Sequence, residues 1–167
     1  MAYYFAFGGN ALPVRNLKKT QWDFRSKMIE GSIAENLVQQ LFLTHKYNVS
    51  RYTKVHAPQS QMPRFVIHHR LSKETYFVEV RFRADGCFSE KDLCNCQYED
   101  ALVIVVSKHS MKCLSVRELK KGWQITPDCS NLLADRSEFE LRRDVVNEFC
   151  QFAGAFFDIP SALYTVS

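Results

Sequence analysis

Apolar residues recur at helical spacing in two long stretches, one in each half of the chain. In residues 21–45 they return every three or four positions, which predicts an amphipathic helix. The stretch 137–157 has similar spacing and precedes Pro160, a residue that ends helices. Residues 1–19 contain two glycines and a proline, so an irregular N-terminal arm is expected there.

Between these helices the pattern changes to the two-residue period of β-strands. Segments 64–70 and 75–83 flank a short polar turn, which predicts an antiparallel hairpin. In 75–83, Val78 and Val80 face one side of the strand. The other side carries Phe77, Glu79, Arg81 and Arg83.

A continuous apolar run at 101–106 predicts a strand that is buried on both faces. Another strand is expected at 111–116, a first one from about Tyr47, and a short helix in the polar stretch 89–100. The predicted order is α-β-β-β-α-β-β-α, which is typical of an α/β fold with a mixed sheet flanked by helices.

Length and composition indicate one globular domain. The chain has 167 residues, of which 46% are hydrophobic and 24% are charged. Residues 20–167 are therefore expected to form a single α/β domain. No apolar run approaches the roughly 18 residues that a membrane span requires, so a membrane location is not expected.

Six cysteines raise the question of disulfides or zinc. Cys94 and Cys96 are separated by one residue and Cys87 lies nearby, but no second pair completes the usual spacing of a zinc site. We expect free thiols in a reducing, cytoplasmic compartment, with zinc as the less favoured alternative.

The net charge of +4 permits contact with nucleic acid without requiring it. Basic residues cluster in two parts of the sequence. They are Arg15, Lys18, Lys19, Arg25 and Lys27 in the first part, and Arg51, Lys54, Arg64, Arg70, Arg81 and Arg83 in the second. For any single residue of this set, a solvated surface position is the simpler interpretation.

Three short motifs occur in a suggestive order. Glu35 lies in the first predicted helix, Pro63-Arg64 opens one strand of the hairpin, and Glu79-Val80-Arg81 lies in the next. From about residue 29 to 116 the sequence resembles the PD-(D/E)XK nuclease superfamily. The resemblance implies a restriction-endonuclease-like mixed β-sheet flanked by helices, with an αβββαβ core and an additional C-terminal helix.

The resemblance also implies a degenerate active site. Members of the superfamily bind Mg²⁺ or Mn²⁺ through an aspartate and a glutamate, and a lysine assists the reaction. Glu35 and Glu79 match the acidic positions, whereas Arg64 replaces the aspartate and Arg81 the lysine. An arginine stays protonated and repels a metal ion. Glu79 and Glu35 would therefore hold a metal only in an active enzyme, and Glu35, Glu79 and Arg81 form a degenerate catalytic set.

Three functions follow from this resemblance. The first is a catalytically degenerate nucleic-acid-binding or regulatory module, in which Arg64, Arg81 and Arg83 contact the substrate. The second is an active endonuclease in which Asp85, Asp100 or Lys91 replaces a missing residue. The third is a protein-interaction subunit that retains only the fold. We further predict that Arg64 takes the place of the metal and lies within ion-pair reach of Glu79 or Glu35.

Overall fold

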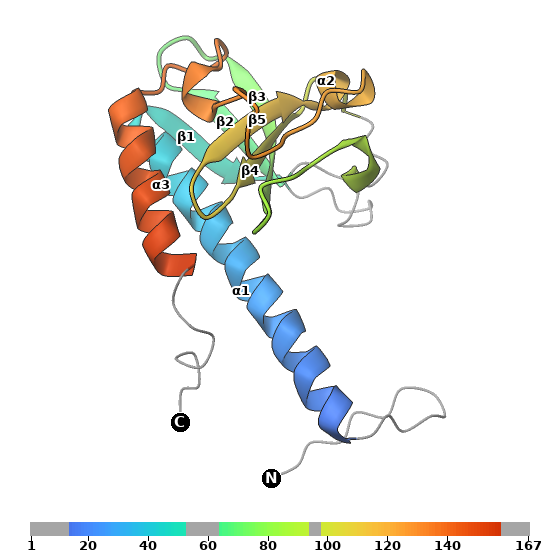
Figure 1. Cartoon of the computed structure of the whole chain (residues 1–167). Coiled ribbons are helices and arrows are strands. Elements are labelled where there is room, and N and C mark those ends of the chain that lie inside the picture. Colours follow the sequence, from blue (N-terminus) through green and yellow to red (C-terminus); the bar gives the residue numbers. More distant parts are fainter. Residues whose placement is uncertain (1–13, 53–63, 94–97, 158–167) are drawn as a thin grey trace.

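The chain folds around a five-stranded sheet whose strands lie side by side in sequence order (Figure 1). The computed structural model describes residues 14–52, 64–93 and 98–157, with side chains from residue 27 onward. The strands are β1 (Tyr47–Arg51), β2 (Phe65–His69), β3 (Thr75–Phe82), β4 (Leu102–Val106) and β5 (Met111–Ser115). Neighbours are antiparallel except for β3 and β4, which are parallel. The predicted mixed α/β sheet and its hairpin are therefore confirmed.

Two helices cover one face of this sheet. Helix α1 (Val14–Thr44) contacts β1, β3 and α3 (Arg143–Phe157), and Figure 1 shows α3 beside the C-terminal half of α1. The N-terminal half of α1 extends beyond the sheet. The prediction of an irregular arm was therefore wrong for residues 14–19, and residues 1–13 lie outside the described part. Among the described helices, none combines the length and apolar character needed to cross a membrane.

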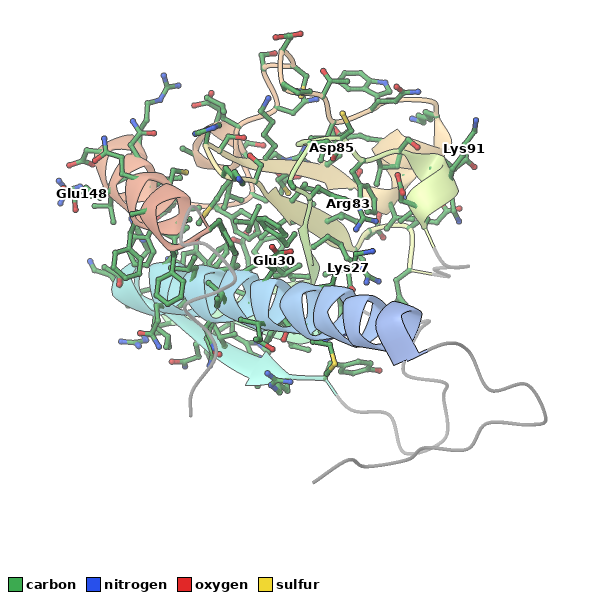
Figure 2. The ribbon with its side chains drawn as sticks, turned by 60° about the horizontal axis from the view of Figure 1, so that its bottom comes forward. Lys27, Glu30, Arg83, Asp85, Lys91 and Glu148 are labelled. Carbon is green, nitrogen blue, oxygen red and sulfur yellow. The ribbon has the colours of Figure 1, made fainter. Side chains whose placement is uncertain are left out.

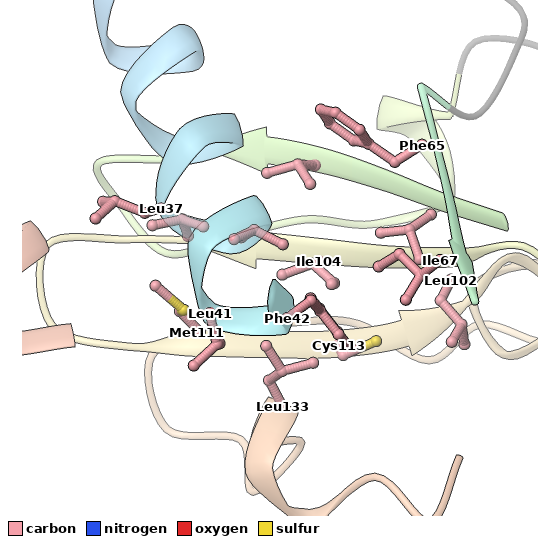
Figure 3. Packing of buried hydrophobic residues seen from close by; sticks show 14 of the residues in the cluster. Leu37, Leu41, Phe42, Phe65, Ile67, Leu102, Ile104, Met111, Cys113 and Leu133 are labelled. Atoms are coloured by element: carbon pink, nitrogen blue, oxygen red, sulfur yellow. The ribbon is translucent and has the colours of Figure 1, made fainter. Parts of the chain in front are cut away.

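The main core lies between the sheet and these two helices (Figure 3). Leu41 and Phe42 of α1 are fully buried against Ile104 of β4 and its neighbours. A second cluster, which includes Val103 and Val105, occupies the other face of the sheet. All five residues of β4 are buried, so the apolar run does form a strand that is covered on both faces.

Short elements cover the second face. Helix α2 (Val116–Lys120) follows β5, and a single 3-10 turn, η1 (Glu90–Asp92), lies between β3 and β4. The short helix predicted in 89–100 is thus only one turn within the described residues, because Leu93 is already extended. Residues 94–97 lie outside the described part. Lys112 of β5 is buried here, and its Nζ donates hydrogen bonds to the carbonyls of Thr126 (2.6 Å) and Pro127 (2.7 Å).

Helix α3 begins at Arg143, six residues later than predicted. The preceding segment is held in a non-helical conformation by contacts with the first half of the chain. The backbone N–H of Glu140 donates to the hydroxyl of Tyr47 (2.8 Å), and that of Arg142 to Nε2 of His45 (3.0 Å). The apolar residues at 139 and 141 therefore pack in a non-helical segment, although their spacing suits a helix.

Candidate functional site

A cavity forms where β3 continues past the end of β2. The hairpin pairing reaches only Phe65 opposite Val78, whereas β3 runs on to Phe82 beside β4. Helix α1 passes this end of β3, and a cavity of about 700 Å³ remains between them. Its charged lining residues are Lys27, Glu30 and Glu35 from α1, Arg64, and Arg81, Arg83 and Asp85 from the end of β3 and the turn after it. We call this group the arginine site.

The sequence predicted four of these residues, and the structure brings them together. Glu35, Arg64, Arg81 and Arg83 line the same cavity although up to 48 positions separate them in sequence (83 − 35). Figure 2 shows Lys27 and Glu30 on α1, with Arg83 and Asp85 at the end of β3 and Glu148 of α3 well away from them.

Glu35 is the anchor of the arginine site. Its side chain is only 8% exposed, and it accepts hydrogen bonds from two guanidinium groups. Nη1 of Arg64 lies 2.5 Å from Oε1, and Nη2 of Arg51 lies 3.4 Å from Oε2. The predicted proximity of Arg64 to an acidic site residue is therefore confirmed. Glu35 carries one negative charge, and Arg64 and Arg51 together carry two positive charges. These three side chains therefore have a net charge of +1.

Glu79 forms a second pair at the same end of the sheet. Its Oε1 lies 2.9 Å from Nη2 of Arg81, and its Oε2 accepts the backbone N–H of Arg64 at 3.2 Å. Burial raises the pKa of Glu79 above its ordinary value, although the charges of Arg81 and Arg64 act in the opposite direction.

Arg83 is held more loosely than the other two arginines of the cavity. Its Nη2 lies 3.5 Å from Asp92 of η1, and its guanidinium stands over the ring of Phe88, 5.4 Å from the centroid. Its Nη1 also donates to the carbonyl of Phe82 at 3.4 Å. The guanidinium has five N–H donors, so others remain to bind a ligand.

Burial separates the two signs of charge at this site. The side chain of Glu35 is 8% exposed and that of Glu79 is 14% exposed. By contrast, the side chains of Arg64 and Arg51 are 49% and 65% exposed. The carboxylates therefore lie inside and orient guanidiniums that face solvent. A ligand that approaches this end of the sheet meets cationic N–H donors first.

The candidates for relocated catalytic residues fall in different places. Asp85 lines the cavity, where its Oδ1 accepts the backbone N–H of Cys87 at 3.0 Å. Asp100 is highly exposed and pairs with Arg117 of α2 at 2.7 Å. Lys91 lies on η1 and is exposed, and it is not among the lining residues of the cavity. Only Asp85 is thus positioned to take part in this site.

Sequence reasoning missed the contributions of Arg51, Lys27 and Glu30. Burial raises the pKa of Glu30, and the charges of Lys108 and Lys27 lower it in part. Lys27, Gly31 and Glu35 recur at intervals of four residues, so they share one face of α1. That spacing is a signal that could have identified the cavity wall. The pairing of Arg51 depends on the tertiary fold and has no local signal.

Metal-binding chemistry was the alternative use of these residues. Across the described side chains, which are those of residues 27–52, 64–93 and 98–157, no three His, Cys, Asp or Glu residues gather closely enough to hold a metal ion. Cys87, Cys113, Cys129 and Cys150 are free thiols, and the CNC segment that motivated the zinc alternative lies outside the described residues.

No protein-family model, no curated protein sequence and no solved structure matches this chain.

Proposed function

We propose that this protein is a catalytically degenerate member of the restriction-endonuclease-like fold that binds nucleic acid, either as a binding protein or as a regulatory module. Support for the fold comes from the order α1-β1-β2-β3-β4 with β4 parallel to β3. Further support comes from the positions of Glu35, Arg64 and Arg81, which line one cavity as the active-site positions of that superfamily would.

The observation that carries the proposal is the pairing of two exposed guanidiniums with the single buried carboxylate of Glu35. A guanidinium has five N–H donors, and Glu35 occupies only some of those on Arg64 and Arg51. The remaining donors are oriented and accessible. The paired N–H donors of a guanidinium match the oxygens of a phosphate group. Phosphate contacts supply a large share of the affinity of nucleic-acid-binding proteins.

The residues present do not fit the metal ion that the fold would imply. Arg64 stands where the superfamily has its aspartate ligand, and its charge already neutralises Glu35. An ion entering beside this guanidinium would be repelled by about 8 kcal/mol at a separation of about 4 Å and an effective dielectric near 20. We therefore assign no metal-dependent step to these residues.

The direct test is the salt dependence of nucleic-acid binding, measured by fluorescence anisotropy with labelled duplex and single-stranded oligonucleotides. The logarithm of the binding constant should fall linearly with the logarithm of the salt concentration, with a slope of about −0.9 per duplex phosphate contacted or about −0.7 for a single strand. Arg64→Ala and Arg81→Ala should each weaken binding. Each should also make the slope shallower by about the amount that one phosphate contact contributes.

Arg70→Ala is the matched control. Arg64 and Arg70 flank β2 at its two ends and both are exposed, but Arg70 bonds to Asn48 (3.0 Å) away from the cavity. The control should bind as the parent does. Binding that ignores salt concentration, or no binding at low salt, would contradict the proposal and favour a protein-interaction subunit.

The position of Asp85 in the cavity is the observation that favours an active endonuclease as the second candidate. In that case the parent should cleave plasmid DNA when Mn²⁺ is added, and Asp85→Asn should abolish the cleavage. Cleavage that is absent from the parent, or unchanged in Asp85→Asn, would count against this candidate.

A further inference from the structure

A groove with apolar walls lies between α1 and α3. It holds a cavity of about 590 Å³, and among the described residues that line it Glu148 is the only charged one. Its apolar lining residues are Ile33 and Leu37 of α1 with Phe149, Phe152 and Phe156 of α3. We call it the phenylalanine groove. No described residue lines both this groove and the cavity of the arginine site.

The apolar surface of the phenylalanine groove is open to solvent and continues along α1. Phe152 is 59% exposed, and on α1 Met28 and Ile29 are 58% and 38% exposed. Ile29 precedes Ile33 by about one helical turn, so both lie on the same face of α1. Exposed apolar patches of this kind mark contact surfaces. A further segment or molecule is therefore expected to cover this one.

Helix α3 brings the chain to the open end of this surface. It begins beside the C-terminal end of α1 and runs back along it (Figure 1). The last residue of α3, Phe157, stacks on Phe82 with ring centroids 4.1 Å apart. Phe82 lines the cavity of the arginine site together with Met28. Residue 158 therefore follows α3 close to the exposed apolar residues of α1.

The segment that follows has the composition and the length to cover the groove. Residues 158–167 read DIPSALYTVS, in which Asp158 is the only charged residue. Pro160 disfavours a continuation of the helix. Ten residues (167 − 157) reach about 33 Å when extended, whereas the groove wall from Ile33 to Gln40 is only about 10 Å long. The apolar residues of the segment are Ile159, Ala162, Leu163, Tyr164 and Val166.

We propose that residues 158–167 bind in the phenylalanine groove of the same chain, with Ile159 and Leu163 against its phenylalanine side chains. Residues 1–13, which contain four aromatic side chains, are the competing segment. They precede Val14, which lies about 28 Å of helix before Ile33. A segment that starts beside the groove loses less conformational entropy on binding than one that starts far away. This inference goes beyond the proposed function and does not depend on nucleic-acid binding.

The first experiment measures nuclear Overhauser effects in the unmodified protein, with labelled methyl groups and aromatic rings. Contacts are expected between the methyl groups of Ile159 and Leu163 and the rings of Phe152 and Phe156. A second sample mixes two preparations that carry different labels, so that filtering detects only contacts between separate chains. The expected contacts should be absent from this mixed sample, because the segment binds within its own chain.

The second experiment measures the melting temperature of full-length variants. Leu163→Asp should lower it by about 3–10 °C, because an apolar side chain leaves the groove. Ser161→Asp is the matched control, because it adds the same charge at a polar position of the same segment. It should shift the melting temperature by no more than about 2 °C. Phe152→Ser combined with Leu163→Asp should lower it by less than the sum of the single changes, because both remove one contact.

Three results would overturn the inference. The first is that the contacts to Phe152 and Phe156 appear between separate chains, which would identify a second copy as the occupant. The second is that the contacts come from residues 1–13 instead of 158–167. The third is that the groove shows no such contact and that Leu163→Asp melts at the same temperature as Ser161→Asp. None of these results bears on salt-dependent binding at the arginine site, so the proposed function is tested separately.

Discussion

The guanidinium of Arg64 lies 2.5 Å from the buried carboxylate of Glu35. These residues are 29 positions apart, one on the helix that crosses the sheet and one at the start of β2. In the superfamily that the sequence resembles, an aspartate that binds the metal ion stands at the position of Arg64, and the helix glutamate assists in the members that have it. Here the pair neutralises itself, because the cation is part of the protein.

A double-mutant cycle should measure the strength of this pair. Glu35→Gln removes the charge of the acceptor and should lower the free energy of unfolding by about 1–2 kcal/mol. The coupling with Arg64→Ala should lie near the lower end of the usual range, roughly 0.5–1 kcal/mol, because the guanidinium is half exposed and partly hydrated. Urea denaturation of the four proteins provides the measurement. A coupling of zero would mean that the contact does not stabilise the fold.

The raised pKa of Glu79 should make both stability and binding depend on pH. The folded protein holds the proton of Glu79 more tightly than the unfolded chain does, whose ordinary value is 4.5. The stabilising contribution of the protonated form is therefore complete below that value and is lost as pH rises through the higher folded pKa. Above the folded pKa, the carboxylate also neutralises Arg81.

Nucleic-acid affinity at constant ionic strength should accordingly increase as pH is lowered through the folded pKa of Glu79. Glu79→Gln should bind more tightly than the parent above that pKa and should show a smaller pH response. Anisotropy titrations measure the binding constants of the parent and of Glu79→Gln at each pH. Titration of the histidines affects both proteins equally, so it cancels in the difference between the two pH profiles. Identical pH profiles would show that Glu79 does not control the charge of the site.

Two glycines in helices should respond oppositely to the same substitution. A Cβ at Gly31 of α1 would meet no atom within 4 Å, so Gly31→Ala should stabilise the protein by about 0.5–1 kcal/mol through helix propensity. A Cβ at Gly154 of α3 would lie 2.6 Å from the carbonyl oxygen of Lys108, so Gly154→Ala should destabilise it by about 1–3 kcal/mol. Changes of the same sign in urea denaturation would contradict the close approach of α3 to the turn that joins β4 and β5.

The sheet could be predicted from sequence because its strands have strong local patterns. The hairpin and the apolar strand β4 were recognised from their two-residue period and their continuous apolar run, and both are present. The helix boundaries were harder to predict from the sequence. The first turns of α1 extend past the sheet. The segment before α3 has helical spacing but is kept non-helical by hydrogen bonds to Tyr47 and His45.

The candidate site was predictable mainly where a residue occupied a motif position or lay directly after one, as Arg83 and Asp85 do. Glu35, Arg64, Glu79 and Arg81 were identified in this way, and the structure places them at one end of the sheet. Arg51 was seen only as one of many basic residues. Its role depends on the distance between β1 and α1, which no local pattern encodes.

Introducing the aspartate and lysine of the superfamily that the sequence resembles should create a metal site. The double variant Arg64→Asp with Arg81→Lys replaces one fixed cation by a carboxylate, so that two or three acidic side chains face the cavity. It should bind Mn²⁺ with oxygen ligands, and calorimetric titration would detect the heat of binding. Arg70→Asp is the control, because it makes the same charge change at the other end of β2. Equal Mn²⁺ binding by both variants would show that the effect is not specific to the cavity.

The central claim, that Arg64 occupies the place of a metal ion, is tested most directly by titrating Mn²⁺ into the unmodified protein in a calorimeter. The claim predicts no binding at this site, and oligonucleotide affinity that is the same with EDTA as with Mn²⁺. Saturable Mn²⁺ binding that disappears in Glu79→Gln, together with cleavage of a plasmid or a single-stranded substrate, would contradict it.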